Sequence, residues 1–561
     1  MRKYLFLFSL LFLVSNAIYG QDLSNLKEQK PIQFSGSLNA NLNFYSTNRE
    51  FRARDPFVWT LSGNPTLRLY GITLPFSFVL SQKNQDFRQP FNQFGVSPYY
   101  KWLTVHLGFR SLSFSQYTLN GHIFNGVGVE ANPGNWRLGG MYGRLLKAVP
   151  QDSLNTVPIQ PTYSRKGYTV KLGYGSQNSY VDLVLFKGWD DVGSIPRPVD
   201  SARVNPQENL ALGIKSRLRI LRKVTFTLDF ALSGWTNNLY AEGSFRDDIP
   251  LSGLINNMLT VNYSTQFLLA GKASLSFRIG RVNFKTQYQR IEPDFQTMGS
   301  YFFNNDLENI TVSPSWSMFR RKLRLALSIG WQRNNLFADK SNQTNRRINS
   351  FRLSYSPTNK LNFSSSLTNY SLNQQQINLV KRDVIDSLTL KQFTNNFSIS
   401  GNYNFGDKIK KYSINLTANQ QSYSQDQVNH AMRDNNSKSL SPSFSFRFNN
   451  KDKKWGWRAG FNFNNFKSAT IQSGRWGLNV SANKKLAEDK FVLNASGSFY
   501  STKLDSEKGG TTMRLNTRLN YTPIEHHSFA IRFSFINRSS SNARVEAFSE
   551  FLGNFNYSYT F

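Results

Sequence analysis

One segment of the chain, residues 290–309, combines side chains that bind metal ions with side chains that bind sugars. Its carboxylates offer the oxygen ligands that calcium takes in proteins, and its aromatic rings offer faces on which a sugar can stack. These side chains belong to Asp294, Tyr301, Phe302, Phe303, Asp306 and Glu308. Their spacing matches no known calcium loop, and ordinary loop packing is the plainer alternative. We treat the segment as a candidate ligand or partner loop, and predict neither a metal site nor a cofactor.

Hydrolytic chemistry would need a histidine beside a nucleophile and an orienting carboxylate. The histidines of the chain are His106, His122, His430, His526 and His527. His106 alternates with its neighbours as a strand residue does, and His526 falls in a predicted turn. A serine next to His106 or His122 is the one arrangement that a barrel hydrolase could use. No sequence motif supports it, so we predict no catalytic residue and no enzymatic activity.

Three short motifs match the Asp-Ser-aliphatic pattern that Bacteroidetes use for O-glycosylation. Their acceptor residues would be Ser153, Ser201 and Ser387. A three-residue pattern arises often by chance in a chain rich in serine. All three nevertheless fall in segments that we predict to be external loops.

The N-terminus of the chain has the features of an export signal, and the predicted strands and loops follow it. Residues 1–20 begin with two cations, continue as a short apolar run and end in small and polar residues, which predicts a signal peptide cut near Gly20. Residues 21–32 would form a short periplasmic segment. The chain has no cysteine, so disulfides and cysteine-bound metals are excluded.

From residue 33 to 561 the chain repeats one pattern, an alternating run of about ten residues followed by a turn or a loop. Residues 513–521 are a clear case, with Leu515 on one face and Arg514 and Arg518 on the other. Runs of this length suit a tilted membrane-crossing strand, whereas strands of soluble sandwiches are nearer five or six residues. We predict an all-β fold, a single large antiparallel transmembrane β-barrel of about 26 strands, within a range of about 22–28.

The predicted strands leave short turns on one side and long loops on the other, as bacterial barrels do. Strands are expected at 64–70, 99–107 and 110–118, the last admitted because it makes the turns and loops alternate. The predicted external loops are 46–63, 83–98, 145–166, 189–207, 235–269, 291–306, 333–347, 372–390, 423–439 and 538–550.

A large barrel needs something to narrow its lumen. Residues 235–269 form the longest predicted loop and include an apolar stretch. We predict that this loop folds inward as a constriction. The residues expected to form it are Leu251, Leu254, Ile255, Met258 and Leu259.

The chain ends in a strand-like stretch with aromatic residues on one face. These residues are Phe555, Tyr557, Tyr559 and Phe561. The pattern resembles the β-signal through which outer-membrane barrel proteins reach the barrel-assembly machinery. We expect this last strand to pair with residues 33–45 and close the sheet, because unpaired backbone groups cannot remain in hydrocarbon.

The chain is strongly basic, with 67 Lys and Arg against 34 Asp and Glu and a formal net charge of +33. The charges are single residues in alternating segments and form no clustered patch, which argues against a nucleic-acid binder. Lysine and arginine at the rims would pair with the phosphates of outer-membrane lipid and lipopolysaccharide, and inward-facing ones would make the lumen attract anions.

Five segments resemble the N-terminal halves of outer-membrane barrel proteins of Bacteroidetes that have no assigned activity. They are residues 52–57, 62–65, 89–102, 117–122 and 141–144. The resemblance implies the outer membrane of a Gram-negative bacterium and adds no chemistry.

Two functions fit these features. The first is an outer-membrane barrel that acts as a pore or export and uptake channel, with a basic, polar lumen and long extracellular loops. The alternative is a non-transporting barrel, a scaffold or accessory subunit of a surface secretion or assembly complex that binds a surface or periplasmic protein. The aromatic loop 291–306 and the Arg-Asp-Pro segment 54–56 favour the alternative.

Overall fold

The computed structural model describes residues 32–561 apart from 53, 70–71, 83–92, 152–159, 199–203, 221–222, 244–252, 254, 256, 302–303, 378–383, 428–435 and 542–545. The predicted signal peptide and periplasmic segment therefore lie almost wholly outside the described residues. No helix within the described ranges is long and apolar enough to cross a membrane.

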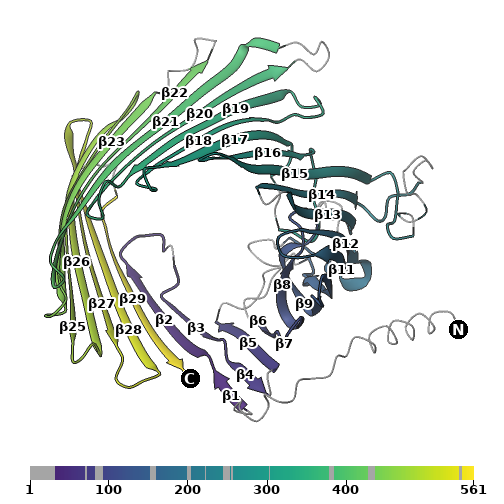
Figure 1. Ribbon diagram of the computed structural model, residues 1–561, viewed down its shortest axis with the longest axis horizontal. Helices are drawn as coiled ribbons and strands as arrows, with labels where there is room; N and C mark the ends of the chain where they lie inside the picture. The colour runs from purple at the N-terminus through teal and green to yellow at the C-terminus, as the bar shows by residue number, and fades with distance from the viewer. Residues whose placement is uncertain are drawn as a thin grey trace.

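The described chain is almost entirely β-strand (Figure 1). The first strands are β1 (Ile32–Ser35), β2 (Ser37–Thr47), β3 (Phe57–Gly63), β4 (Thr66–Leu69), β5 (Ile72–Ser81), β6 (Gln93–Val96), β7 (Tyr99–Tyr100), β8 (Leu103–Ser113), β9 (Asn120–Ala131), β10 (Trp136–Leu146), β11 (Ser164–Gly175), β12 (Tyr180–Asp191), β13 (Glu208–Ile220) and β14 (Val224–Thr236). The later strands are β15 (Thr265–Ile279), β16 (Val282–Ile291), β17 (Leu307–Met318), β18 (Leu323–Arg333), β19 (Asn342–Tyr355), β20 (Leu361–Ile377), β21 (Val384–Gly406), β22 (Lys410–Gln427), β23 (Ser437–Asn450), β24 (Trp455–Ser468), β25 (Gln472–Leu486), β26 (Phe491–Leu504), β27 (Glu507–Tyr521), β28 (His527–Ser540) and β29 (Phe548–Thr560). A short 3-10 helix, η2 (Val192–Ser194), follows β12.

These strands form one closed antiparallel barrel. Each is hydrogen-bonded to its neighbours, and β2 pairs with β29 from Ser37–Thr560 to Thr47–Glu550, so the last strand closes on the first (Figure 1). Within the described residues, three barrel strands are each split in two, as β1 and β2, β3 and β4, and β6 and β7, so the 29 segments make 26 strands. The predicted fold class and strand number are confirmed.

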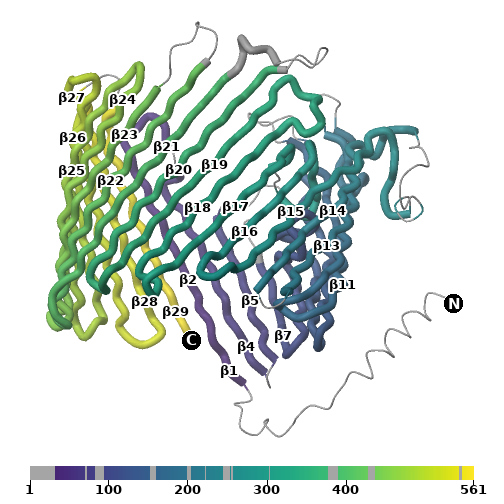
Figure 2. The backbone as a smooth tube through the Cα atoms, turned by 45° about the horizontal axis from the view of Figure 1, so that its top comes forward, coloured from purple at the N-terminus to yellow at the C-terminus, as the bar shows by residue number. Residues whose placement is uncertain are grey.

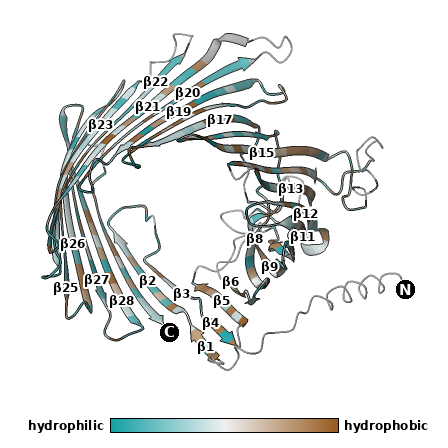
Figure 3. Ribbon diagram, viewed as in Figure 1, coloured by the Kyte–Doolittle hydropathy of each residue, from teal (hydrophilic) through white to brown (hydrophobic). Residues whose placement is uncertain are grey.

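The wall alternates between an apolar exterior and a polar interior. In β27, Leu515 is exposed on the outside, while Arg514 and Asn516 face the lumen. Figure 2 shows that the strands run obliquely around the barrel, and Figure 3 shows hydrophobic and hydrophilic positions alternating along them. A closed barrel leaves no backbone group unpaired in hydrocarbon, so this is the membrane-spanning form that bacterial outer membranes contain.

Outward-facing rings form a belt near the rim at which the chain ends. Over β21 to β24 its members are Tyr403, Phe405, Tyr412, Phe446, Phe448, Trp455 and Trp457. Neighbouring rings touch, as do Phe405 and Tyr412, whose centroids are 5.2 Å apart. Aromatic belts mark the depth at which a barrel meets the headgroup layer.

Several predicted strand boundaries near the N-terminus are wrong. Residues 57–63, expected in a loop, form β3, and the strand expected at 110–118 does not exist, because β8 runs unbroken from Leu103 to Ser113. Gly108, with φ +82°, carries β8 through the position where the sequence suggested a turn. The chain turns at Lys101 instead, where φ is 50°. Several outer loops are also shorter than predicted, because strands such as β20 and β21 extend into them.

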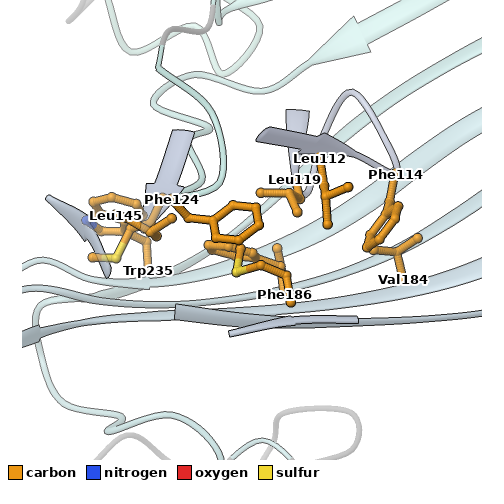
Figure 4. Close-up of a cluster of buried hydrophobic side chains, with 11 residues drawn as sticks. Leu112, Phe114, Leu119, Phe124, Leu145, Val184, Phe186 and Trp235 are labelled. Atoms are coloured by element: carbon orange, nitrogen blue, oxygen red, sulfur yellow. The ribbon is translucent and has the colours of Figure 1, made fainter. Parts of the chain in front are cut away.

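One part of the wall has a core of its own. The end of β8 and the start of β9 lie over the inner surface of β10 and β12 to β14, and apolar side chains fill the space between them (Figure 4). Leu112, Leu119 and Phe124 face Val184 and Phe186, and Phe124 and Phe186 are completely buried. This packing thickens one side of the barrel.

Candidate functional site in the barrel lumen

Facing pairs of arginines lie on the inner wall. Arg447 of β23 is the direct cross-strand neighbour of Arg458 of β24, and Arg518 of β27 is that of Arg532 of β28. No described Asp or Glu forms an ion pair with any of the four. Like charges directly opposite each other in a sheet are destabilising. The wall therefore keeps these cations at the expense of some stability.

Amides surround these arginines and meet across the closing strands. The Asn554 side chain of β29 donates to the carbonyl oxygens of Asn41 and Asn43 in β2, at 3.1 and 2.9 Å. Arg518 donates to Asn520 at 3.0 Å, and Arg458 donates to Ser445 at 3.2 Å. Neutral hydrogen bonds hold the guanidinium groups without neutralising them.

Two recesses in this wall hold the arginine pairs. One, of about 880 Å³, is lined by Arg447 and Arg458 near the rim at which the chain ends. The other, of about 670 Å³, is lined by Arg518, Arg532 and Arg54. Its described lining contains no Asp or Glu and includes the amides of Asn41, Asn43, Asn483, Asn494, Asn516 and Asn554. Each recess is large enough for a small polar solute.

The opposite wall is covered by two segments that fold into the lumen. Residues 114–119, between β8 and β9, lie on the inner face of β14, where Asp229 accepts hydrogen bonds from Ser115 Oγ and from the backbone amide of Gln116. Asp229 alternates with Phe230, which is exposed on the outside. Lys215 of β13 also donates to the carbonyl of Phe114, at 3.0 Å. These bonds fix the turn against the wall.

The second segment is the loop 291–301, which meets the first. Phe295 is completely buried and packs edge-to-face against Tyr117, with ring centroids 6.1 Å apart. Asn120 donates to the carbonyl of Gly299 at 2.9 Å, and an added Cβ at Gly299 would lie 2.3 Å from the carbonyl oxygen of Thr118. Only glycine permits this approach. The two segments form a packed inner unit, which we call the inner plug and which consists of residues 114–119 and 291–301.

Two carboxylates on the inner face of this side form ion pairs with arginines. Arg137 pairs with Asp182, and Arg165 with Asp190, each at 2.7 Å. The two aspartates are almost fully buried, and burial requires such pairing. The lumen is thus electrostatically asymmetric, with ion pairs on the side of β10 to β13 and unpaired arginines on the side of β23 to β28.

The predicted constriction is wrong, because the loop after β14 folds outward. Ile255 and Leu259 are buried against Leu210. Leu210 alternates with Asn209, whose side chain bonds to Thr297 of the inner plug and so faces inward. Leu210, and the described loop residues that pack on it, therefore lie outside the wall, and Figure 1 shows the described part of the segment between β14 and β15 beyond the barrel.

Polar contacts hold this outward loop in place. Glu208, which pairs with Lys187, accepts a hydrogen bond from the amide of Thr260 at 2.6 Å. Met258 packs against the same apolar cluster. Leu251 and Leu254 of the predicted constriction lie outside the described residues.

Two carboxylates of the predicted ligand or partner loop, Asp306 and Glu308, are already engaged. Asp306 accepts hydrogen bonds from the amide of Leu336 at 2.9 Å and from Lys340 Nζ at 2.7 Å. Glu308 pairs with Arg333 and accepts a hydrogen bond from Tyr288. No three metal-ligating side chains gather anywhere in the described chain.

Tyr301 of that loop points inward. The ring of Tyr301 stacks on that of His122 with centroids 4.1 Å apart, and its hydroxyl accepts a hydrogen bond from the amide of Ile123. Asp294 has φ 60° in the turn that directs the loop into the lumen. Phe302 and Phe303 lie outside the described residues. The loop as a whole was expected to face outward, and that expectation is wrong for residues 295–301.

The structure describes the backbone of only one of the three candidate glycosylation residues. Ser153 and Ser201 fall outside the described residues, and Ser387 lies in β21, not in the loop that the sequence suggested. Glycosylation at these positions stays a prediction.

One cluster brings a histidine to a serine and a carboxylate. Ser97 Oγ is 2.9 Å from His106 Nδ1, and Glu130 is 3.5 Å from Nε2. His106 Nε2 is buried and makes no hydrogen bond to any described residue. The Glu130 carboxylate therefore approaches His106 at ion-pair distance.

Comparison with known proteins adds little about function. No protein-family model matches the chain, and no curated protein matches it in sequence. Among solved structures it is similar to OccAB2 of Acinetobacter baumannii, at 10% identity and TM-score 0.30 over 64% of this chain and 92% of that one. It is also similar to OpdQ of Pseudomonas aeruginosa, at 12% identity and TM-score 0.34, over 61% of this chain and 93% of that one. The similarity to the outer membrane protein opdK of the same species is 11% identity and TM-score 0.29, over 69% of this chain and 100% of that one.

Proposed function

We propose that the protein is an outer-membrane channel whose lumen favours anionic polar solutes. This proposal rests on two cross-strand arginine pairs, Arg447 with Arg458 and Arg518 with Arg532. No described carboxylate in the wall neutralises them. Cations that share a low-dielectric wall focus the field and raise the local concentration of anions.

The surrounding amides supply the second requirement of a channel. A solute that leaves bulk water loses hydrogen bonds, and Asn483, Asn494 and Asn516 offer both donors and acceptors along the wall. Arginine forks bind carboxylate or phosphate with two parallel hydrogen bonds. Several such sites in a row let a solute pass from one to the next without being held at any of them.

The inner plug complements this wall. It occupies the side of the lumen between β9 and β16, where Asp182 and Asp190 form ion pairs, and leaves the arginine recesses uncovered. The space left for solutes therefore adjoins the cationic side.

A flux measurement in liposomes tests the proposal. We expect purified protein to pass a sugar acid several-fold faster than the neutral sugar of the same size, and expect the ratio to approach one in the R447Q/R458Q/R518Q/R532Q variant. A variant with the same change in net charge, K438Q/K467Q/K503Q/K508Q, alters exposed lysines at the opposite ends of the strands and should keep the ratio. No flux of either solute would favour the scaffold.

A further inference from the structure

The short turns at the rim where the chain ends are rich in cations. Residues 319–322 contain three consecutive cations, and residues 407–411, 451–454 and 484–490 each contain three. All of these side chains are exposed. The turns follow one another around the barrel edge from β17 to β26.

Two of the four carboxylates in these turns are used locally. Asp407 caps its own turn, because its Oδ1 accepts hydrogen bonds from the amides of Ile409 and Lys410. Asp489 pairs with Lys454 and Lys485 at 3.0 and 3.5 Å. Neither Lys410 nor Lys484 has a described carboxylate at ion-pair distance. The edge therefore presents a net positive charge to its surroundings.

Two of these lysines stand on the outer face in one row with a tryptophan. The cross-strand register runs from Lys410 of β22 to Asn450, then to Trp455, and then to Lys484 of β25. Trp455 belongs to the outward aromatic belt. An ammonium beside an aromatic ring at the end of a membrane strand is positioned for the headgroup layer.

Further along the same strands the outer wall is hollowed. A recess of about 430 Å³ is lined by Phe363, Leu416, Phe444 and Phe461, with Gly401 among them. These five residues form one cross-strand row. Gly401 leaves space in this row, because an added Cβ would meet only the Phe363 ring, at an ordinary contact distance of 3.5 Å.

The distance between the recess and the lysine row is about the length of one phospholipid acyl chain. Leu416 lies six residues beyond Lys410 in β22, which corresponds to roughly 20 Å along a strand. The rings of Tyr412, Phe448 and Trp457 cover the wall between them. A phospholipid whose phosphate lies at the lysine row would place its hydrocarbon tail in the recess.

We propose that β20 to β25 form a binding site for an anionic phospholipid of the periplasmic leaflet. The headgroup phosphate binds Lys410 and Lys484 beside Trp455, and one acyl chain fills the recess at Gly401. An acidic soluble protein fits less well, because the cations follow the barrel perimeter in a narrow row and the recess lies at hydrocarbon depth. The site is independent of what the lumen transports.

Native mass spectrometry of the full chain, released from nanodiscs of phosphatidylethanolamine with phosphatidylglycerol, tests this proposal. We expect retained phosphatidylglycerol on the wild type and at least a tenfold weaker preference for it in K410Q/K484Q. The matched control is K438Q/K467Q, which removes two outward lysines that face each other at the opposite ends of β23 and β24. The control should retain the lipid.

A second variant separates the tail from the headgroup. Gly401→Leu fills the recess without backbone strain, so we expect weaker retention of long-chain phosphatidylglycerol while a short-chain analogue binds as before. Equal retention by the wild type and K410Q/K484Q would overturn the proposal, as would equal retention of phosphatidylethanolamine by the wild type. Retention of an acidic protein in place of lipid would also overturn it. Heat-modifiable migration on gels confirms that each variant is folded.

Discussion

Arg518 and Arg532 are direct cross-strand neighbours on the inner wall, with Asn494 beside the first and Asn554 beside the second. Two cations at this spacing repel each other, and no described carboxylate pairs with either one. An arrangement that costs stability and is easily relieved by one substitution points to a role in the lumen.

The substitution Arg532→Glu should stabilise the barrel and impair its selectivity. The new carboxylate would pair with Arg518 across β27 and β28, a gain of roughly 0.2–1 kcal/mol over the present repulsion. Thermal unfolding in detergent would measure the stability. The ratio of acidic to neutral sugar flux would measure the selectivity. Arg532→Gln removes the repulsion without adding a negative charge, so its stability and its flux ratio should lie between those of the wild type and Arg532→Glu. A stabilised variant with unchanged selectivity would show that this pair does not select solutes.

The inner plug should depend on Asp229. In Asp229→Ala the hydroxyl of Ser115 and the amide of Gln116 lose their acceptor. The loss costs about 1–3 kcal/mol for the buried Ser115 hydroxyl and less for the Gln116 amide, which is exposed. We expect larger single-channel conductance and more current noise in planar bilayers, because residues 114–119 are released. Asp229→Asn retains one acceptor and should be milder. Conductance identical to wild type in both variants would mean that the plug does not narrow the pathway.

Acid should release the loop between β18 and β19. Burial opposes ionisation of Asp306, but the hydrogen bonds from Lys340 and from the amides of Leu336 and Asn335 outweigh it and lower the pKa of the carboxyl. The hydrogen bond to Asp306 in turn raises the pKa of Lys340. The stabilisation is thus complete at neutral pH and is lost as the pH falls below about 4, through the lowered pKa of the carboxyl.

Pepsin cleavage near Phe337, which is exposed, would follow this change. In the wild type we expect cleavage to accelerate as the pH falls from 4 to 2, beyond the change in pepsin activity on an unfolded peptide. Asp306→Asn should be cleaved readily throughout that range. A wild type and variant with the same pH profile would show that the ion pair does not hold the loop.

The outward loop after β14 should be dispensable for conduction. Replacing Ile255 and Leu259 with serine removes its apolar contacts with Leu210 outside the wall. We expect protease sensitivity of the loop to rise while single-channel conductance stays at the wild-type value. A change in conductance would restore the original prediction that this loop narrows the lumen.

The final residue should matter more for assembly than for stability. Phe561 stacks on Phe34 with centroids 4.2 Å apart, and its backbone pairs with Gly36. Replacing Phe561 with Asp should reduce outer-membrane insertion in cells severely, while protein refolded in detergent loses little stability. Ser558→Asp, at a polar inward position of β29, is the control. Normal surface levels of the Phe561 variant would contradict the prediction.

Alternation along the chain was enough to predict the barrel and its number of strands, because the two-residue period of a strand is local. The period also placed Arg518 in the lumen, since Leu515 and Leu519 had to face lipid. It could not place the turn at Lys101, because Gly108 looks like a turn in sequence yet continues β8 at positive φ.

The direction of the loops could not be read in the same way. Ile255 and Phe295 are both apolar loop residues, but the first packs on the outside of the wall and the second in the lumen. The difference lies in the partners, Leu210 and Tyr117, which are distant in sequence. The facing arginines were equally hidden, because their pairing depends on the register of neighbouring strands.

The most direct test of the account is the zero-current potential of the reconstituted wild-type channel across a gradient of potassium chloride. A lumen with four inward arginines that no described carboxylate pairs should favour chloride over potassium, and the potential should move toward zero in R447Q/R458Q/R518Q/R532Q. A wild-type channel that prefers potassium, or a preference for chloride that survives removal of all four arginines, would contradict the account.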